Sequence, residues 1–130
     1  MKIRVAFADT DAMGIVHHAN YLRFFEAARV EWLRERGMDY TKMMARGQHL
    51  PLVTSECRYK KPARFDDILE IVVTPKVERV RITLNYEVFN TETKELIATG
   101  ATQHVCVDNA MKVLELPQDL IEAGKKWIET

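Results

Sequence analysis

Cysteine is scarce in this sequence. Cys57 and Cys106 lie far apart and form no Cys-x-x-Cys motif, so the disulfide framework of a small secreted protein is excluded. We expect two reduced thiols in a cytoplasmic protein. We interpret both as small apolar side chains of strands, the alternative being a catalytic thiol.

An excess of charge and a long apolar run are also missing. Lys and Arg total 19, and so do Asp and Glu, which gives a formal net charge of zero. Nothing therefore favours nucleic acid or an anionic membrane surface, and an anionic ligand would need a local basic patch. No apolar run approaches the roughly 20 residues that span a bilayer, and the first residues lack the apolar core of a signal peptide. We expect one domain, residues 1–130, with 47% apolar residues to fill its core.

Aromatic residues are concentrated in one predicted helix. They recur with other apolar side chains at helical spacing, at Tyr21, Phe24, Phe25, Ala28 and Trp32. The spacing predicts a helix over 17–36, and Gly37 is a natural end for it. So wide an aromatic face indicates a helix covered by a sheet. A short helical turn is expected over 41–46.

The remaining segments alternate with a period of two, which is typical of strands. The first is 2–7, with Ile3, Val5 and Phe7 on one side. Four more are expected within 50–60, 67–78, 81–90 and 95–108, where Gly100 could relieve strand curvature. Pro117 begins a predicted final helix over 116–129. The fold class is therefore α+β, an antiparallel sheet with one apolar helix packed on it.

Acids and imidazoles are concentrated just before the long helix, in the stretch DTDAMGIVHH from Asp9 to His18. The first N–H groups of a helix lack internal partners and carry the positive end of its dipole, so they can stabilise an oxyanion. Asp11 is close enough in sequence to act on a carbonyl bound there, as a nucleophile or as a general base on water. Gly14 allows a sharp turn between acid and helix. The arrangement fits hydrolysis of an acyl compound.

Plainer interpretations of this stretch remain open. Asp9 and Asp11 could be turn and capping residues. His17 and His18 could bind a metal, although adjacent helical residues point about 100° apart and serve one metal poorly. We expect one imidazole to face solvent and the other a pocket.

Basic side chains form a second candidate feature. They occur in two groups, Arg58, Lys60, Lys61 and Arg64, followed by Arg79 and Arg81. Such groups on neighbouring strand ends could hold phosphates, for which guanidinium geometry is well suited. The alternative is a solvated sheet edge whose charges prevent aggregation.

The acidic stretch and the helix after it resemble the 4-hydroxybenzoyl-CoA thioesterase family of hot-dog-fold proteins, and most closely its Tol-Pal-associated acyl-CoA thioesterase branch. The matching residues are Asp9, Asp11, Gly14, Ile15, Val16, His17, His18, Asn20, Tyr21, Glu26, Ala28 and Arg29, with a weaker match at Pro62, Ala63 and Asp67. The resemblance covers nearly the whole chain. It departs at His17, where relatives often have Tyr or Trp, and at Met13, where small residues are common, so both could reshape the acyl pocket.

The resemblance implies a hot-dog fold, a long helix wrapped by a curved antiparallel sheet, assembled as a homodimer or homotetramer with active sites at the subunit interface. It implies that Asp11 is the catalytic carboxylate and that the backbone N–H of His18 polarises the thioester carbonyl, its side chain helping to position water or substrate. Asp9 is expected to be structural. The expected substrate-binding residues are Gly14, Ile15, Val16, His17, Asn20 and Tyr21. The expected coenzyme A contacts are Lys60, Lys61, Arg64, Arg79 and Arg81, with no metal and no cofactor, since coenzyme A is part of the substrate.

Three functions compete. The first is an acyl-CoA hydrolase, with the acyl group and the use of acyl carrier protein thioesters left open. The second is a hydroxyacyl dehydratase, which needs a His paired with an acid across the interface. The third is a non-catalytic module that binds acyl-CoA or acyl carrier protein. One fold hosts many activities, and the Asp-x-Asp motif favours the hydrolase.

Overall fold

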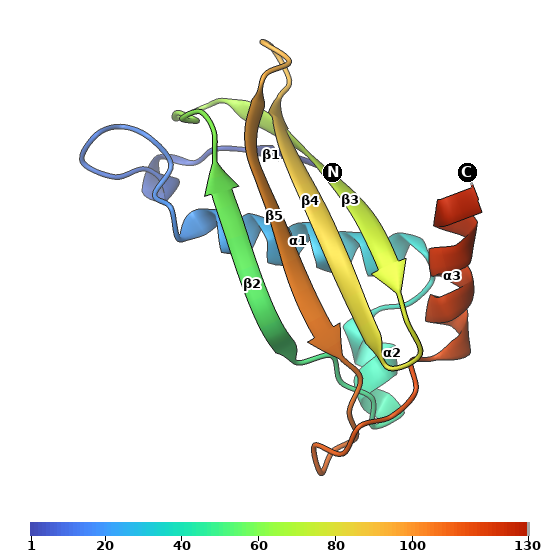
Figure 1. The fold of residues 1–130 in the computed structure, drawn as a ribbon. Coiled ribbons are helices and arrows are strands. Elements are labelled where there is room, and N and C mark those ends of the chain that lie inside the picture. The colour runs from blue at the N-terminus through green and yellow to red at the C-terminus, as the bar shows by residue number, and fades with distance from the viewer. Residues whose placement is uncertain (130) are drawn as a thin grey trace.

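The computed structural model describes the backbone of residues 1–129 and the side chains of residues 1–124. Within this part, five strands form one antiparallel sheet in the order β1-β3-β4-β5-β2, and a long helix crosses one of its faces (Figure 1). The strands are β1 (Lys2–Arg4), β2 (Leu52–Tyr59), β3 (Ile68–Val77), β4 (Arg81–Asn90) and β5 (Leu96–Val105). The helices are η1 (Phe7–Asp9, a 3-10 turn), α1 (Asn20–Glu35), α2 (Tyr40–Ala45) and α3 (Gln118–Glu129). The predicted α+β class is confirmed.

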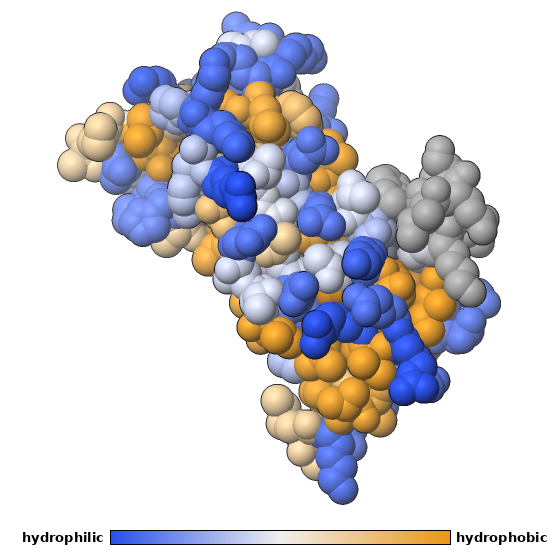
Figure 2. All heavy atoms as spheres, viewed as in Figure 1, coloured by the Kyte–Doolittle hydropathy of each residue, from blue (hydrophilic) through white to orange (hydrophobic). Residues whose placement is uncertain are grey.

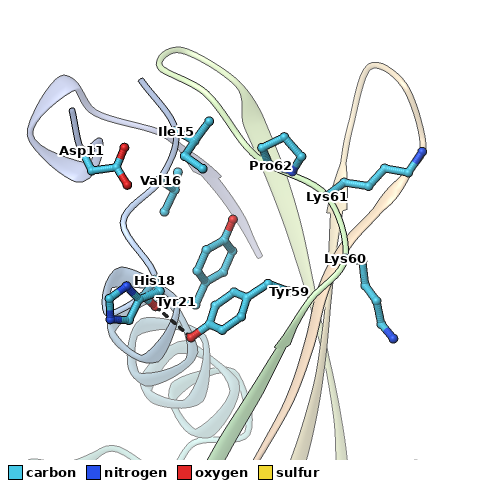
Figure 3. A pocket seen from close by; sticks show the side chains of 9 residues that line it. All are labelled: Asp11, Ile15, Val16, His18, Tyr21, Tyr59, Lys60, Lys61 and Pro62. Carbon is cyan, nitrogen blue, oxygen red and sulfur yellow. Dashed lines mark hydrogen bonds between the residues drawn. The ribbon is translucent and has the colours of Figure 1, made fainter. Parts of the chain in front are cut away.

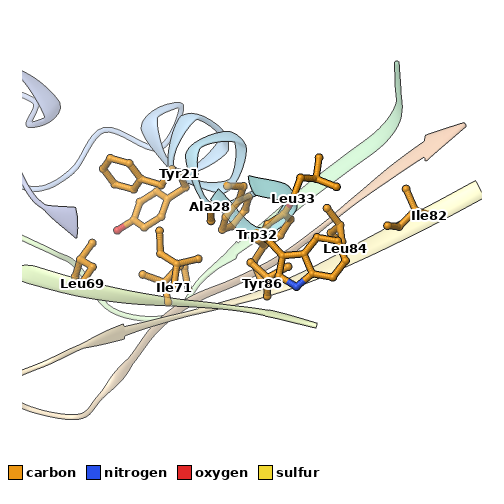
Figure 4. Close-up of a cluster of buried hydrophobic side chains, with 14 of the residues drawn as sticks. Tyr21, Ala28, Trp32, Leu33, Leu69, Ile71, Ile82, Leu84 and Tyr86 are labelled. Atoms are coloured by element: carbon orange, nitrogen blue, oxygen red, sulfur yellow. The ribbon is translucent and has the colours of Figure 1, made fainter. Parts of the chain in front are cut away.

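The core lies between α1 and the inner face of the sheet (Figure 4). Phe25 stacks on Tyr86 of β4, with ring centroids 4.3 Å apart and an interplanar angle of 10°. Gly100 of β5 makes this approach possible. A Cβ there would overlap the Phe25 ring and lie 2.8 Å from the Glu56 carbonyl oxygen. The glycine is therefore required for close packing, whereas the sequence suggested relief of curvature.

The opposite face of the sheet is polar across its middle (Figure 2). In β4 the residues that face outward are Arg81, Thr83, Asn85 and Glu87, while their neighbours are buried. This alternation is what a sheet covered on one face requires. No helix of the described residues is both long and apolar enough to cross a membrane. Cys57 and Cys106 are free thiols, as predicted.

Two boundaries near the N-terminus differ from the predicted ones. The long helix begins at Asn20, not at residue 17, so His17 and His18 precede it. The first strand ends at Arg4, and Phe7 lies in η1 with 76% of its surface exposed. The reason is local, because the Asp9 side chain accepts the Ala6 N–H at 2.8 Å and bends the chain into a turn. The predicted helix near 41–46 and the one after Pro117 are confirmed as α2 and α3.

A buried polar chain crosses the core beneath α1. The His104 ring donates from Nδ1 to the Leu50 carbonyl at 3.1 Å, and its Nε2 accepts from the Thr102 hydroxyl at 2.9 Å. Thr102 in turn accepts from the Tyr86 hydroxyl at 2.7 Å. The same Nε2 lies 3.4 Å from Nη1 of Arg29, and a guanidinium can only donate, so Nε2 is an acceptor and the imidazole is neutral. Burial, reinforced by the charge of Arg29, lowers the pKa of His104 to about 4.

His104 makes stability depend on pH. In the unfolded chain the pKa of His104 is 6.5. Between pH 6.5 and about pH 4, His104 is therefore protonated in the unfolded state and neutral in the native state. Stability should fall as pH falls through this window, by about 3 kcal/mol in total from this group. Urea midpoints of wild type and His104→Gln at pH 7, 5.5 and 4 test this, with His49→Gln as control. The variant should lose most of the slope that wild type and control share, and equal slopes in all three would contradict the assignment.

Candidate functional site

A cavity of about 410 Å³ opens at the start of α1 (Figure 3). Three segments form it: the loop after η1, the entrance to α1, and the end of β2 with the residues that follow. Its lining residues are Asp11, Ile15, Val16, His18, Tyr21, Tyr59, Lys60, Lys61 and Pro62. The structure thus brings Asp11 and His18 into one cavity, as the sequence predicted for the two catalytic candidates.

The loop that carries Asp11 is closed by its own backbone. The Asp11 N–H donates to the Ile15 carbonyl, and the Gly14 N–H donates to the Asp11 carbonyl, both at 2.9 Å. Gly14 has a φ of +77°, a conformation that glycine adopts without strain, so the predicted sharp turn is present. The Val16 N–H then donates to the Ala63 carbonyl at 2.8 Å, which fixes the loop against the segment after β2.

One of the two oxygens of the Asp11 carboxylate is hydrogen-bonded within the loop. Its Oδ1 accepts the Met13 N–H at 2.8 Å, while Oδ2 has no partner among the described residues. The side chain is partly exposed at the cavity wall. The turn therefore orients the carboxylate and leaves one oxygen for a bound carbonyl or water.

Asp9, two residues earlier, is buried and fully engaged. Its carboxylate accepts the Ala6 N–H and forms an ion pair with Arg23 of α1. Its carbonyl accepts the His17 N–H at 2.9 Å and the Asn20 side-chain amide at 2.8 Å. These contacts agree with the structural role expected for Asp9. They also show that Asn20 stabilises the entrance to α1 and does not line the cavity.

One backbone donor at the entrance to α1 is free. The His17 carbonyl accepts the Asn20 N–H at 2.9 Å, so it points into the helix. Because the peptide is trans, the His18 N–H on its other side points outward, and it has no acceptor among the described residues. The neighbouring Ala19 N–H is already used, since it donates to the His17 Nδ1 at 3.2 Å. A carbonyl oxygen in the cavity would find the His18 N–H available.

The two imidazoles lie together but not on a helix. Their rings stack with centroids 4.1 Å apart. His18 lines the cavity and His17 does not, so one of them faces the pocket as predicted. Among the described residues, no three His, Cys, Asp or Glu side chains are grouped to hold a metal ion.

Two tyrosines form a wall of the cavity. Tyr21 and Tyr59 pack edge to face with centroids 5.4 Å apart. Burial raises the pKa of Tyr21 to about 12, so this phenol stays neutral. Tyr59 and Pro62 were not predicted as site residues. Tyr59 continues the period-two alternation of the strand predicted over 50–60, on the same face as Cys57, and this pattern is the signal that could have found it.

The predicted coenzyme A contacts are split between two ends of the sheet. Lys60 and Lys61 line the cavity, and Lys61 pairs with Glu95. Arg64 adjoins the site through its backbone, which bridges to Ile15, but its side chain is not part of the lining.

Arg79 and Arg81 lie at the opposite end. On β5, Tyr59 pairs with Ala98 and Arg81 pairs with Val105, a separation of about 23 Å at roughly 3.3 Å per residue. Within one chain these arginines do not reach the cavity.

The remaining predicted residues lie at the margin of the site. Gly14 shapes the loop, and His17 lies behind His18, outside the lining. The Met13 side chain is 78% exposed and is also outside the lining, so its backbone N–H is its contribution to the site.

Known proteins resemble this chain over nearly its full length. The model of the thioesterase-like superfamily matches residues 5–124. The acyl-CoA thioester hydrolase YbgC of Escherichia coli is 32% identical over 95% of this chain and 93% of its own. The structure of a 1,4-dihydroxy-2-naphthoyl-CoA thioesterase from Synechocystis gives a TM-score of 0.91 at 28% identity, covering 96% of this chain and 93% of that one. A hypothetical protein from Aquifex aeolicus gives a TM-score of 0.88 at 39% identity, covering 95% and 96%.

Replacing each of the two acids of the motif by alanine should have different effects on the stability of the fold. Asp9→Ala removes a buried carboxylate that accepts the Ala6 N–H and pairs with Arg23, so it should destabilise the fold by about 2 kcal/mol. Asp11→Ala removes only an exposed turn contact and should cost well under 1 kcal/mol. Urea denaturation of both variants beside wild type measures the difference, and equal losses would contradict the structural assignment of Asp9.

Proposed function

Because the chain belongs to the thioesterase-like superfamily, we propose that it hydrolyses the thioester of an acyl-CoA to the free acid and coenzyme A, with Asp11 as the catalytic group. The hot-dog fold expected from the motif is confirmed, and so is membership of the thioesterase-like superfamily. The Tol-Pal-associated branch and a cytoplasmic location remain predictions. One observation carries the proposal. Asp11, whose carboxylate has one oxygen without a partner, and His18, whose backbone N–H has no acceptor, line one cavity at a helix entrance.

The reaction follows from these two groups. The thioester carbonyl oxygen accepts the His18 N–H, where the helix dipole stabilises the negative charge that develops on it. The free oxygen of Asp11 either attacks the carbonyl carbon or removes a proton from a water that attacks it. The carbon–sulfur bond breaks. In the water route the thiolate of coenzyme A takes up the proton that Asp11 removed, and in the direct route it takes up a proton from water. In the first route, water then hydrolyses the acyl–Asp11 anhydride. In a single turnover in oxygen-18 water, label found in Asp11 identifies direct attack, since hydrolysis of the anhydride at the aspartyl carbonyl places it there and the water route never does.

The cavity walls suit an acyl group. Ile15, Val16 and Pro62 give aliphatic surface, and the two tyrosines give aromatic surface. Both aliphatic and aromatic acyl groups fit this chemistry. Lys60 and Lys61 at the rim carry positive charge for the phosphates of coenzyme A or of an acyl carrier protein prosthetic group.

We also propose that two copies pair through β2. This strand is at the edge of the sheet, and all its residues except Cys57 are exposed, including Leu52 and Val53 at 54% and 49%. A long exposed edge of this kind favours pairing with another strand. Two-fold antiparallel pairing would set the Leu52 end of one β2 beside the Tyr59 end of the other. Arg79 and Arg81 of the partner subunit would then lie at the end of the sheet that holds this chain's cavity. There they could contact coenzyme A, as the family resemblance implies.

The decisive activity test is Asp11→Asn. Its amide oxygen can still accept the Met13 N–H, so the turn is retained while the charge is lost. We expect kcat to fall at least about 100-fold with an unchanged melting temperature. Release of coenzyme A is followed with a thiol-reactive dye, over acyl-CoA esters from acetyl to palmitoyl together with benzoyl and 4-hydroxybenzoyl.

The wild type and the variant must be compared on the ester that turns over fastest. Full activity in Asp11→Asn would contradict the catalytic assignment. Binding of acyl-CoA without turnover of any ester would favour the non-catalytic module instead.

The proposed interface has its own test. Val53→Lys places a charge on the exposed surface of β2, whereas Thr74→Lys places the same charge on exposed β3 surface away from that edge. Light scattering should give wild type and Thr74→Lys at least twice the chain mass of 15.1 kDa, and Val53→Lys a monomer with reduced activity. A monomeric wild type, or an unchanged mass in Val53→Lys, would contradict pairing through β2.

A further inference from the structure

We propose that Tyr59 and His17 are positioning residues that hold His18 from two sides and so aim its free N–H into the cavity. This inference rests on the proposed thioesterase function, which makes that N–H the oxyanion donor. Neither residue is assigned a chemical step. Tyr59 lies at the end of β2, and His17 lies in the turn before α1, so the two supports come from different parts of the chain.

Tyr59 supports His18 through its carbonyl. The Tyr59 hydroxyl donates to the His18 carbonyl oxygen at 3.3 Å, across the mouth of the cavity (Figure 3). The same oxygen also accepts the Tyr21 N–H at 3.3 Å. The Tyr59 ring is held by its edge-to-face contact with Tyr21, which is only 3% exposed. The hydroxyl therefore connects the edge strand to the entrance of α1.

His17 supports His18 through its ring and through the backbone that follows. The two rings stack at 4.1 Å with an interplanar angle of 29°. The His17 Nδ1 also accepts the Ala19 N–H at 3.2 Å. Because this contact occupies the Ala19 N–H, the His18 N–H is the one backbone donor of residues 17–21 without an acceptor among the described residues.

The expected consequence is a loss in kcat and not in KM. An oxyanion donor stabilises negative charge that develops only in the transition state. A small shift of its N–H away from the oxyanion weakens this stabilisation. Tyr59→Phe keeps the aromatic wall of the cavity and removes only the hydroxyl. The acyl group should bind as before. The His18–Ala19 peptide becomes less well fixed, and with it the backbone angles of His18 that orient its N–H.

The first experiment compares Tyr59→Phe with Tyr40→Phe. The Tyr40 hydroxyl is buried without a partner and lies outside the cavity, so it is a matched deletion. We expect kcat of Tyr59→Phe to fall about fivefold at constant KM, and the control to match wild type. A raised KM at constant kcat would overturn the proposal, because it would make Tyr59 a binding wall only.

The second experiment separates the two contacts of His17. His17→Asn offers an oxygen to the Ala19 N–H but loses the ring stack, and His17→Phe keeps a ring but loses the acceptor. Each should retain more kcat than His17→Ala, for which we expect about a fivefold loss. His49→Ala, a histidine outside the cavity, should have no effect. Because both residues act on His18, the Tyr59→Phe/His17→Ala double variant should lose less than the product of the single losses.

An NMR readout tests the proposal independently of turnover. In protein labelled with nitrogen-15 histidine, Tyr59→Phe and His17→Ala should shift or broaden the His18 amide and ring signals, while Tyr40→Phe should leave them in place. If wild type hydrolyses no acyl-CoA but these signals respond, the thioesterase function fails and the positioning contacts stand. If the signals do not respond, the positioning role is overturned whatever the activity.

Discussion

Asp9 connects the segments on which the cavity depends. Its carboxylate holds the start of η1 through the Ala6 N–H and holds α1 through Arg23. Its carbonyl holds the turn before α1 through His17 and Asn20. Residues 10–16 therefore form a loop whose two ends are both held by Asp9. That closure places the Asp11 loop in front of the helix entrance, so the buried acid positions the exposed one.

The two acids differ in environment, and this difference decides what each can do. Every polar atom of the buried Asp9 carboxylate is occupied, so a substrate finds nothing to bind there. Asp11 uses one oxygen for the Met13 N–H and keeps the other free at the cavity wall. A reacting group needs both fixed orientation and an available atom, and only Asp11 combines them.

Much of this architecture could be predicted from the sequence, because apolar spacing reports directly on burial. The aromatic stripe of α1 and the alternating strands are of that kind, and the family motif pointed to Asp11 and His18, which line one cavity. Local hydrogen bonds decided the features that were missed. Phe7 continues an apolar alternation, yet the Asp9 carboxylate bends the chain and exposes it. His17 and His18 fit a helix by spacing, yet the ring of His17 caps the backbone and the helix begins later.

Contacts between segments that are far apart in the sequence decided the other features that were missed. Tyr59 and the entrance to α1 are about 40 positions apart in sequence, and their contact depends on sheet register that no local pattern reveals. The two basic groups looked equivalent in the sequence, but the antiparallel path sends them to opposite ends of the sheet. Edge strand β2 therefore has two tasks in the proposed assembly. Its outer edge would pair with a second copy, and its last residue, Tyr59, would hold the oxyanion donor. Pairing that orders β2 would also order Tyr59, so assembly and catalysis would be coupled through this strand.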